Sequence, residues 1–391
     1  MKFYMPTRVF DEKDCVKKHA ADLSSCGTKA LIVTGRHSAE KCGALADVTQ
    51  VLEDNGTAWC HFAEIEENPS VETVVKGAIY GKEQAADFVI GIGGGSAMDA
   101  ATAIAFLMYR PEILAEDLYN GELPTRSLDV VAVPTTCGTG SEVTGVSVLT
   151  RHEKKTKASI PHRIFPKLAL VDGKYLANAP QSIITNTAVD ALAHMIESYE
   201  SKAADDYSKA AALAGLRIWS SCKDLLLPGG CSALRAGCSE AEGAAVAASE
   251  TAASAENTAA AGEEAAARLM RASTFAGIAI AQTGTSIPHA LSYTVTYDLH
   301  MPHGMACGYF LTGFLKEMPE EDRSTVLEAA GFTDVNDFCG FMEKAFPGIS
   351  VPEEVLRRAY DTVSANPVRM SSCRFYCDAE VLARITGSAQ A

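Results

Sequence analysis

The chain has 391 residues, of which 47% are hydrophobic and 21% are charged, an ordinary composition for a globular protein with room for two cores. Its formal net charge of −15 argues against nucleic acid or an anionic membrane as the main partner, because both attract clustered Lys and Arg. The chain shows no apolar run long enough to span a membrane, no signal-peptide pattern, and twelve scattered cysteines without a CxxC pair. We therefore expect a soluble, cytoplasmic protein with reduced thiols.

Short apolar runs alternate with helical patterns over the first 180 residues. The predicted strands lie at 30–34, 59–62, 88–92, 130–133 and 168–172, and the clearest helical patterns lie at 38–55 and 70–84. Such alternation is typical of a parallel sheet with helices on both faces. We therefore predict an α/β nucleotide-binding domain over residues 1–180.

The remaining half of the chain has a different character. Long Ala- and Leu-rich segments with few β-branched runs predict an all-α domain over residues 181–391. Within it, residues 231–267 are rich in Ala, Glu and Ser and low in bulky apolar side chains, so they bury little area. We expect this segment to be an exposed insertion, marginally helical or partly disordered, with a structural role.

A glycine-rich turn follows the predicted strand at 88–92. The sequence GIGGGSAMD at 91–99 leads into a helical run that starts at Ala100. Glycines allow a phosphate to approach the backbone, and the first N–H groups of a helix donate to it. The spacing is not GxGxxG, and a plain strand-to-helix turn is the alternative. The candidate phosphate-binding residues are Gly93, Gly94, Gly95, Ser96 and Asp99.

A second polar cluster, PTTCGTGSE at 134–142, follows the predicted strand at 130–133. Ordinary turns favour the same residues, so this cluster is weak when taken alone. Two such clusters at the ends of neighbouring strands, however, predict a single ligand-binding crevice. The candidate cofactor-binding residues here are Thr135, Thr136, Cys137, Thr139 and Ser141.

Four side chains further along the chain are candidate metal ligands. Asp190 and His194 lie four apart in the helical run at 187–199, which places them on one helix face. Such a pair alone is more often a surface pair or a cap. His289 and His303, each preceded by proline, supply two more imidazoles. Three imidazoles and one carboxylate suit Zn²⁺ or Fe²⁺ and not Mg²⁺ or Ca²⁺.

Four motifs in order carry a resemblance to a known family. They are GGGSAMDAA at 93–101, PTTCGTGSEVT at 134–144, AVDALAHMIE at 188–197, and His289 followed by PHG at 302–304. With them the chain resembles the iron-containing (group III) alcohol dehydrogenase family over nearly its whole length. The resemblance implies the dehydroquinate synthase-like fold, with an N-terminal α/β nucleotide-binding domain, a helical C-terminal domain and a metal in the cleft between them.

The resemblance also implies roles for individual residues. It assigns metal binding to Asp190, His194, His289 and His303, and it places Lys157 near the cofactor. It implies Fe²⁺ as the metal, although nitrogen–oxygen sites generally bind Zn²⁺ more tightly. Finally, it implies a homodimer or larger homo-oligomer, often formed through the N-terminal strand, which is residues 2–9 here.

The chain departs from the family pattern at two positions near the site. Tyr293 stands where relatives often have a histidine four residues after the third ligand, and Thr102 stands in place of a lysine after the glycine turn. The missing lysine weakens diphosphate binding or changes its geometry. The missing histidine leaves the proton path to water, the cofactor ribose or another side chain, with Tyr293 and His300 as candidates.

The end of the first predicted strand bears on the choice of nicotinamide cofactor. NAD-preferring relatives carry an aspartate there, whereas this chain has Gly35, Arg36 and Ser38. Gly35 leaves room for a 2′-phosphate, and Arg36 or Ser38 could bind it. We therefore expect NADP(H) to be preferred over NAD(H), unless Arg36 merely faces solvent.

The expected function is that of a metal-dependent alcohol dehydrogenase or aldehyde reductase that acts on a small primary alcohol or aldehyde. One alternative is a related enzyme that also uses a nicotinamide and a metal, either glycerol dehydrogenase-like or a sugar-phosphate cyclase. A more remote alternative is a non-catalytic nucleotide-binding protein. The natural substrate is left open.

Overall fold

The computed structural model describes residues 3–154, 156–230 and 252–387. Its six-stranded sheet is parallel throughout, with the strand order β1-β8-β5-β4-β2-β3. The strands are β1 (Arg8–Asp11), β2 (Lys29–Gly35), β3 (Ala58–Ile65), β4 (Phe88–Gly93), β5 (Asp129–Pro134) and β8 (Leu168–Val171). The five strands predicted from the sequence are confirmed, and β1 adds an edge strand.

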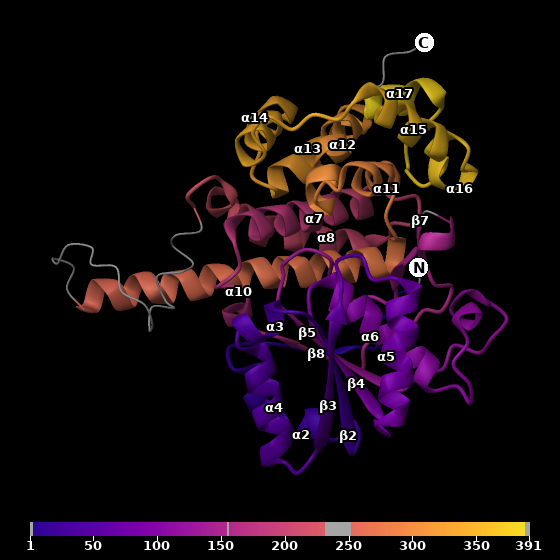
Figure 1. Ribbon diagram of the computed structural model, residues 1–391. Helices are drawn as coiled ribbons and strands as arrows, with labels where there is room; N and C mark the ends of the chain where they lie inside the picture. The colour runs from indigo at the N-terminus through magenta and orange to yellow at the C-terminus, as the bar shows by residue number, and fades with distance from the viewer. Residues whose placement is uncertain (1–2, 155, 231–251, 388–391) are drawn as a thin grey trace.

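Helices cover both faces of this sheet, as predicted (Figure 1). Alternate β-strand side chains point to opposite faces, so Leu31 packs with α5 and α6 while Ile32 packs with α4. Both faces are therefore buried, which explains why these strands appear as continuous apolar runs in the sequence. The helices of this region are α1 (Cys15–Lys18), α2 (Ala20–Ser24), α3 (Ser38–Lys41), α4 (Ala44–Asp54), α5 (Val71–Glu83) and α6 (Gly95–Met108).

Three local predictions need correction. The single helix predicted at 38–55 is two helices, α3 and α4, because Gly43 between them has a left-handed φ of 84°. The helix after the glycine turn begins at Gly95 and not at Ala100. The N-terminal strand expected at 2–9 begins only at Arg8 within the described residues, because only from there does the chain pair with β8.

A short antiparallel hairpin lies outside the main sheet and was not predicted. It consists of β6 (Val148–Arg151) and β7 (Thr156–Ser159), paired from Val148↔Ser159 to Arg151↔Thr156. The backbone of Ser70, which caps the start of α5, bridges to Thr150 in β6. The hairpin thus holds Lys157 over the sheet end that carries the glycine turn.

The chain after Pro180 is helical, as predicted, in the part that the structure describes. Its helices are α7 (Gln181–Tyr199), α8 (Asp206–Ser220), α10 (Ala252–Thr283), α11 (Ile287–Leu299), α12 (His303–Glu317), α13 (Glu320–Ala329), α14 (Val335–Ala345), α15 (Glu353–Ser364), α16 (Pro367–Met370) and α17 (Ala379–Thr386). The long helix α10 packs on α7 and α8 and crosses the molecule between them and the sheet (Figure 1).

The segment predicted as an exposed insertion, 231–267, lies partly outside the described residues. Its last portion, from Ala252, is the start of α10, which projects beyond the body of the molecule (Figure 1). By Ala266 the helix is buried, and the backbone there closely approaches Gly173. The segment therefore ends as packed helix.

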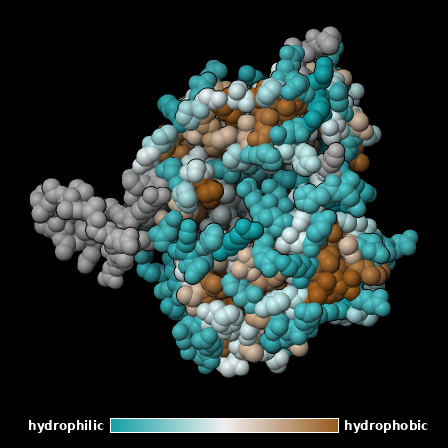
Figure 2. Space-filling model, viewed as in Figure 1, coloured by the Kyte–Doolittle hydropathy of each residue, from teal (hydrophilic) through white to brown (hydrophobic). Residues whose placement is uncertain are grey.

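The outer surface agrees with the acidic composition. Hydrophilic residues dominate the face shown in Figure 2, and hydrophobic residues form separate patches on it. Among the described residues, no helix combines the length and the apolar character needed to cross a bilayer.

The strand order creates a switch point at the carboxyl ends of β2 and β4. The chain runs from β2 outward to β3, then returns to β4 on the other side and continues toward β5 and β8. Loops from β2 and β4 therefore diverge, leaving a crevice in which open parallel sheets bind their ligands. Gly35 and the glycine turn at 93–95 lie at this crevice.

Candidate metal and cofactor site

The four predicted metal ligands converge on one point. Asp190 and His194 lie one turn apart on α7, and the Asp190 Oδ1 to His194 Nε2 distance is 4.0 Å. His289 comes from the first turns of α11, with its Nε2 3.3 Å from Asp190 Oδ1. His303 begins α12, with its Nε2 3.9 Å from the same oxygen. Helix α7 and the two later helices, which lie about a hundred residues further along the chain, thus form one cage.

The donor atoms of this cage fit a divalent ion. Four ligands about 2.1 Å from a tetrahedral metal lie roughly 3.4 Å from one another, close to the 3.3 to 4.0 Å found here. Asp190 Oδ1 and His289 Nε2 are buried without a hydrogen-bond partner. Buried polar atoms are costly to leave unpaired, so these two need a ligand. The nitrogen-rich set with one carboxylate suits Fe²⁺ or Zn²⁺.

A buried carboxylate that the sequence interpretation missed orients His289. Glu197 Oε1 lies 2.5 Å from His289 Nδ1, and Glu197 Oε2 accepts a hydrogen bond from the Ser286 backbone N–H at 2.6 Å. Burial raises the pKa of Glu197, but His289 and the hydrogen bonds together lower it below its usual value. An ionised Glu197 holds the Nδ1 proton and turns Nε2 toward the cage. Its spacing of seven from Asp190 on one helix face was the available signal.

The two other imidazoles are oriented in the same way. The His194 Nδ1 atom lies 3.2 Å from the Gly138 carbonyl oxygen, which belongs to the second polar turn. The His303 Nδ1 atom lies 3.4 Å from the hydroxyl of Ser292 on α11. Each contact leaves Nε2 facing the cage, so the protein sets the ring orientation before any metal arrives.

Cys307 is a second neighbour that was missed. It lies one turn after His303 on α12, is fully buried, and its Sγ is 3.8 Å from His303 Nε2. The ligand atoms of Asp190, His289, His303 and Cys307 all lie within 4.8 Å of one another. Burial raises the pKa of this thiol. The His-x3-Cys spacing was the signal that could have found it.

A cleft of about 1290 Å³ joins this cage to the switch point of the sheet. Most predicted cofactor residues line it: Ser38, Gly94, Gly95, Ser96, Asp99, Thr135, Thr136, Thr139, Ser141 and Lys157. Gly35 and Gly93 line a smaller adjoining pocket of about 190 Å³ together with Ser38 and Gly94. The same cleft therefore contains both the candidate metal cage and the candidate cofactor-binding residues.

The two predicted polar turns touch each other at the start of α6. Gly93 has a φ of 151°, and a Cβ on Gly95 would lie 2.6 Å from Cγ2 of Thr139. This packing requires glycine and leaves the first N–H groups of α6 at the cleft. A helix start lined by glycines and hydroxyls suits a diphosphate.

Two ionisable side chains at this end of the cleft, Asp99 and Lys157, have pKa values far from their usual ranges. Asp99 Oδ2 accepts the Val148 backbone N–H at 2.9 Å, Oδ1 is buried without a partner, and burial raises the pKa of Asp99 to about 7. Lys157 Nζ donates to Asn68 Oδ1 at 2.7 Å, and burial lowers the pKa of Lys157 to about 8. Such shifts are common at ligand-binding sites.

Three predicted site residues lie away from the cleft. Arg36 is exposed and is not among the lining residues; His37 and Lys41 line the cleft near that position instead. Cys137 is buried against α7, with its Sγ 3.8 Å from the Ile184 carbonyl oxygen. His300 ends α11 in a left-handed conformation (φ 51°) with an exposed side chain.

Tyr293 and Thr102, the two positions that depart from the family pattern, lie in different surroundings. Tyr293 lines the cleft, and its ring stacks on His303 with centroids 5.9 Å apart and an interplanar angle of 8°. Thr102 is buried within α6 and does not line the cleft. Thr102 thus packs inside the protein in place of the lysine of relatives, whereas the phenol of Tyr293 lines the cleft beside the metal cage.

The sheet with its glycine turn and the helices with their Asp/His₃ cage define a nucleotide- and metal-binding class of protein. Residues 6–173 match the family described as iron-containing alcohol dehydrogenase, and residues 241–342 match the C-terminal family of Fe-containing alcohol dehydrogenases. An iron-containing alcohol dehydrogenase structure from Thermotoga maritima is similar at 30% identity, with 98% of both chains covered and a TM-score of 0.82.

Curated relatives of the chain are also alcohol dehydrogenases and aldehyde reductases, in agreement with the family match. The chain is 31% identical to 1-propanol dehydrogenase PduQ of Citrobacter freundii over 64% of this chain and 57% of that protein. It is 37% identical to lactaldehyde reductase of Escherichia coli K12 over 45% of this chain and 47% of that protein. The chain thus spans 47% to 57% of the length of these two relatives. It belongs to the iron-containing alcohol dehydrogenase family, which confirms the resemblance and implies iron and a nicotinamide dinucleotide as cofactors.

Proposed function

We propose that the protein reduces a small aldehyde with a nicotinamide cofactor and catalyses the reverse oxidation of the primary alcohol. The observation that carries this proposal is the convergence of Asp190, His194, His289 and His303 at the cleft that also contains the glycine turn. The family match supports an alcohol dehydrogenase over a cyclase or a non-catalytic protein. We also propose a cytoplasmic location, a division into two domains near residue 180, and a homo-oligomer formed through the N-terminal strand.

When bound, the divalent ion supplies Lewis acidity toward the substrate oxygen and the reduced nicotinamide supplies the hydride. The hydride brings an electron pair to the carbonyl carbon, the C=O π bond opens, and a proton completes the alcohol on oxygen. The chain's own residues orient the reactants. The start of α6, with Thr136 and Thr139, would hold the diphosphate, and the cage would hold the ion that positions the reacting end of the substrate.

The direct test is an aldehyde panel offered with NADPH and with NADH to Fe²⁺-loaded protein kept anaerobic. We expect oxidation of the reduced cofactor to match aldehyde consumption, with the alcohol as product. Loss of that activity after chelation, and its recovery with Fe²⁺ or Zn²⁺, is also expected. A metal-loaded protein that turns over no aldehyde and oxidises no primary alcohol would contradict the proposal.

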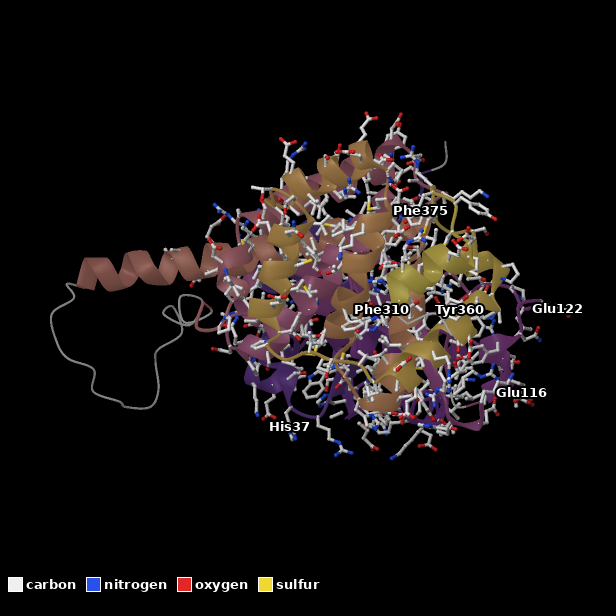
Figure 3. All side chains as sticks on the ribbon, turned by 90° about the horizontal axis from the view of Figure 1, so that it is seen from above. His37, Glu116, Glu122, Phe310, Tyr360 and Phe375 are labelled. Carbon is white, nitrogen blue, oxygen red and sulfur yellow. The ribbon has the colours of Figure 1, made fainter. Side chains whose placement is uncertain are left out.

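The preferred cofactor is proposed to be NADP(H). Gly35 ends β2 without a side chain and is followed by Arg36, His37 and Ser38, none of which is a carboxylate. Glu66 and Glu67 line the small pocket beside Gly35, and Lys41 lines the cleft nearby. His37, which also lines the cleft, lies at the outer edge of the molecule (Figure 3). A lysine suits a 2′-phosphate as a point charge, so Lys41 takes the role first expected of Arg36.

We therefore expect kcat/KM for NADPH to exceed that for NADH by about tenfold. The Lys41→Gln variant should bring this ratio close to one, because it removes a charge that only the 2′-phosphate uses. Lys344→Gln, which changes an exposed lysine on α14, serves as the charge-matched control and should keep the ratio. A clear preference of the unmodified protein for NADH would overturn the proposal.

Tyr293 is proposed as the proton donor in place of the absent histidine. Burial raises the pKa of this phenol, so it stays protonated at neutral pH. The Tyr293→Phe variant keeps the ring stack on His303 but lacks the hydroxyl. We expect kcat for aldehyde reduction to fall by about 10²-fold with unchanged metal content, since positioned acids contribute on that scale. An unchanged kcat and pH profile would assign proton delivery to water.

A further inference from the structure

Three further cations line the cleft. They are Arg163, Lys202 and Arg369, and we refer to them as the cationic rim. They come from distant parts of the chain, namely the segment before β8, the loop after α7, and α16. Their presence in one cleft is therefore a product of the tertiary fold.

The charges of the rim are not neutralised by carboxylates. Arg369 donates from Nη1 to the Thr285 carbonyl oxygen at 2.9 Å, and Arg163 donates from Nη2 to the Ala281 carbonyl oxygen at 2.8 Å. Among the described residues, no ion pair within 4.0 Å involves Arg163, Lys202 or Arg369. Carbonyl groups fix the direction of a guanidinium but leave its charge available.

The backbone holds the rim in place. The Lys202 N–H donates to the Ser372 carbonyl oxygen at 2.8 Å, and Ser201 bridges to Cys373. The contact of Arg369 with Thr285 ties the same segment to the residues that lead into α11. The guanidinium groups of Arg163 and Arg369 are therefore held in place before a ligand binds, which lowers the ordering entropy that binding costs.

Arg369 is close to the reacting end of the cleft. Thr285 lies four residues before His289, a ligand of the cage. Burial raises the pKa of Tyr293, and the positive charges of His289 and Arg369 oppose that rise. A substrate whose oxygen lies at the cage and whose chain extends past Tyr293 therefore places its far end near Arg369.

The carboxylates that line the cleft belong to other parts of it. Asp190 is in the cage, Asp99 accepts a hydrogen bond from the β6 backbone, and Glu67 raises the pKa of Lys157 against the effect of burial. The phosphates of the cofactor have their own site at the start of α6. The rim thus offers positive charge that neither the protein nor the cofactor uses.

We propose that the substrate is an aldehyde, or its alcohol, with an anionic head group (a carboxylate, sulfonate or phosphonate) that Arg369 binds. Arg163 and Lys202 add to the attraction, which the chain's net charge of −15 would otherwise oppose. A guanidinium suits these head groups because its N–H donors match two oxygens at once. This inference rests on the proposed function and specifies the substrate class of the same site.

The test compares anionic and neutral aldehydes of similar size on the metal-loaded protein. The pairs are 4-oxobutanoate with butanal, and sulfoacetaldehyde with propanal. We expect kcat/KM for the anionic member of at least one pair to exceed that of its neutral partner by about 10- to 100-fold. The pair with the larger ratio distinguishes a carboxylate from a sulfonate. Propane-1-sulfonate should also inhibit butanal reduction competitively.

The Arg369→Gln variant provides the decisive comparison, with Lys344→Gln as the charge-matched control. We expect Arg369→Gln to raise KM for the anionic aldehyde about 10- to 100-fold, to affect butanal much less, and to weaken inhibition by propane-1-sulfonate in parallel. Arg163→Gln should act in the same direction with a smaller effect. Equal losses for both kinds of aldehyde would make Arg369 a structural residue and overturn the inference, as would a wild-type preference for neutral aldehydes. Turnover of neither kind would instead contradict the proposed function.

Discussion

Replacing His289 with alanine is expected to remove both the bound metal and the activity. His289 Nε2 lies closest to Asp190 Oδ1 of the three imidazoles, at 3.3 Å, and its other nitrogen lies 2.5 Å from Glu197. The substitution deletes a ligand and leaves Glu197 as a buried charge without its partner. We expect kcat/KM to fall by on the order of 10³-fold, because the cage no longer holds the ion that assists the reaction.

The measurement is metal content by mass spectrometry together with aldehyde reduction. Breaking a buried ion pair costs about 3–5 kcal/mol, so thermal unfolding must be followed in parallel. His194→Ala is the second variant, since the contact of His194 is with the Gly138 carbonyl oxygen and leaves no orphaned charge. His152→Ala, at an exposed histidine, is the matched control and should keep both metal and activity. Stoichiometric metal and full activity in both cage variants would disprove the assignment.

The Gly304→Ala variant is expected to damage the cage without touching a ligand. A Cβ at this position would lie 1.9 Å from the Asn186 carbonyl oxygen and 3.0 Å from the Asp190 backbone nitrogen. Both obstacles are backbone atoms of α7, so no side chain can rotate away. Helix α12 must retreat from α7 by about 1 Å, and such overpacking typically costs about 1–3 kcal/mol.

The same movement carries His303 away from Asp190, because His303 begins α12 directly before Gly304. Metal sites tolerate displacements of only about 0.2 Å, so we expect metal affinity to fall by more than about tenfold and Tm to drop by several degrees. Gly340→Ala is the control, because nothing lies within 4 Å of its Cβ position on α14. That variant should be slightly more stable, since alanine favours helix. Unaltered metal affinity in Gly304→Ala would show that α12 adapts.

The sequence by itself revealed the parts of the site that are encoded locally. The spacing of four between Asp190 and His194 fixes their common helix face, whatever the rest of the chain does. The run of glycines after an apolar strand likewise predicts a turn that admits phosphate. The pattern of the apolar residues predicted five of the six strands of the sheet and the helical second half. Each of these features depends on local backbone geometry, so it can be predicted from a single segment of the chain.

Other features depend on which distant segments meet. Glu197 and His289 are 92 residues apart, and only the packing of α11 on α7 brings them within 2.5 Å. The position of Cys307 also depends on tertiary packing, because its thiol lies beside the cage only when α12 packs against α7. Lys41 on α3 lines the cleft whereas Arg36 is exposed and does not, which the sequence pattern did not distinguish.

The substrate end of the cleft shows most clearly what the tertiary structure decided. No sequence pattern links Arg163, Lys202 and Arg369, and each would be interpreted as an ordinary surface cation when considered alone. The fold brings all three to the cleft, with the two guanidinium groups held by neutral backbone carbonyls. Short-range spacing in the sequence therefore predicted the Asp190–His194 pair and the glycine turn, whereas the resemblance to the family supplied the roles of His289 and His303. The positive charge of the cationic rim arises from the packing of distant segments, which no local sequence pattern predicts.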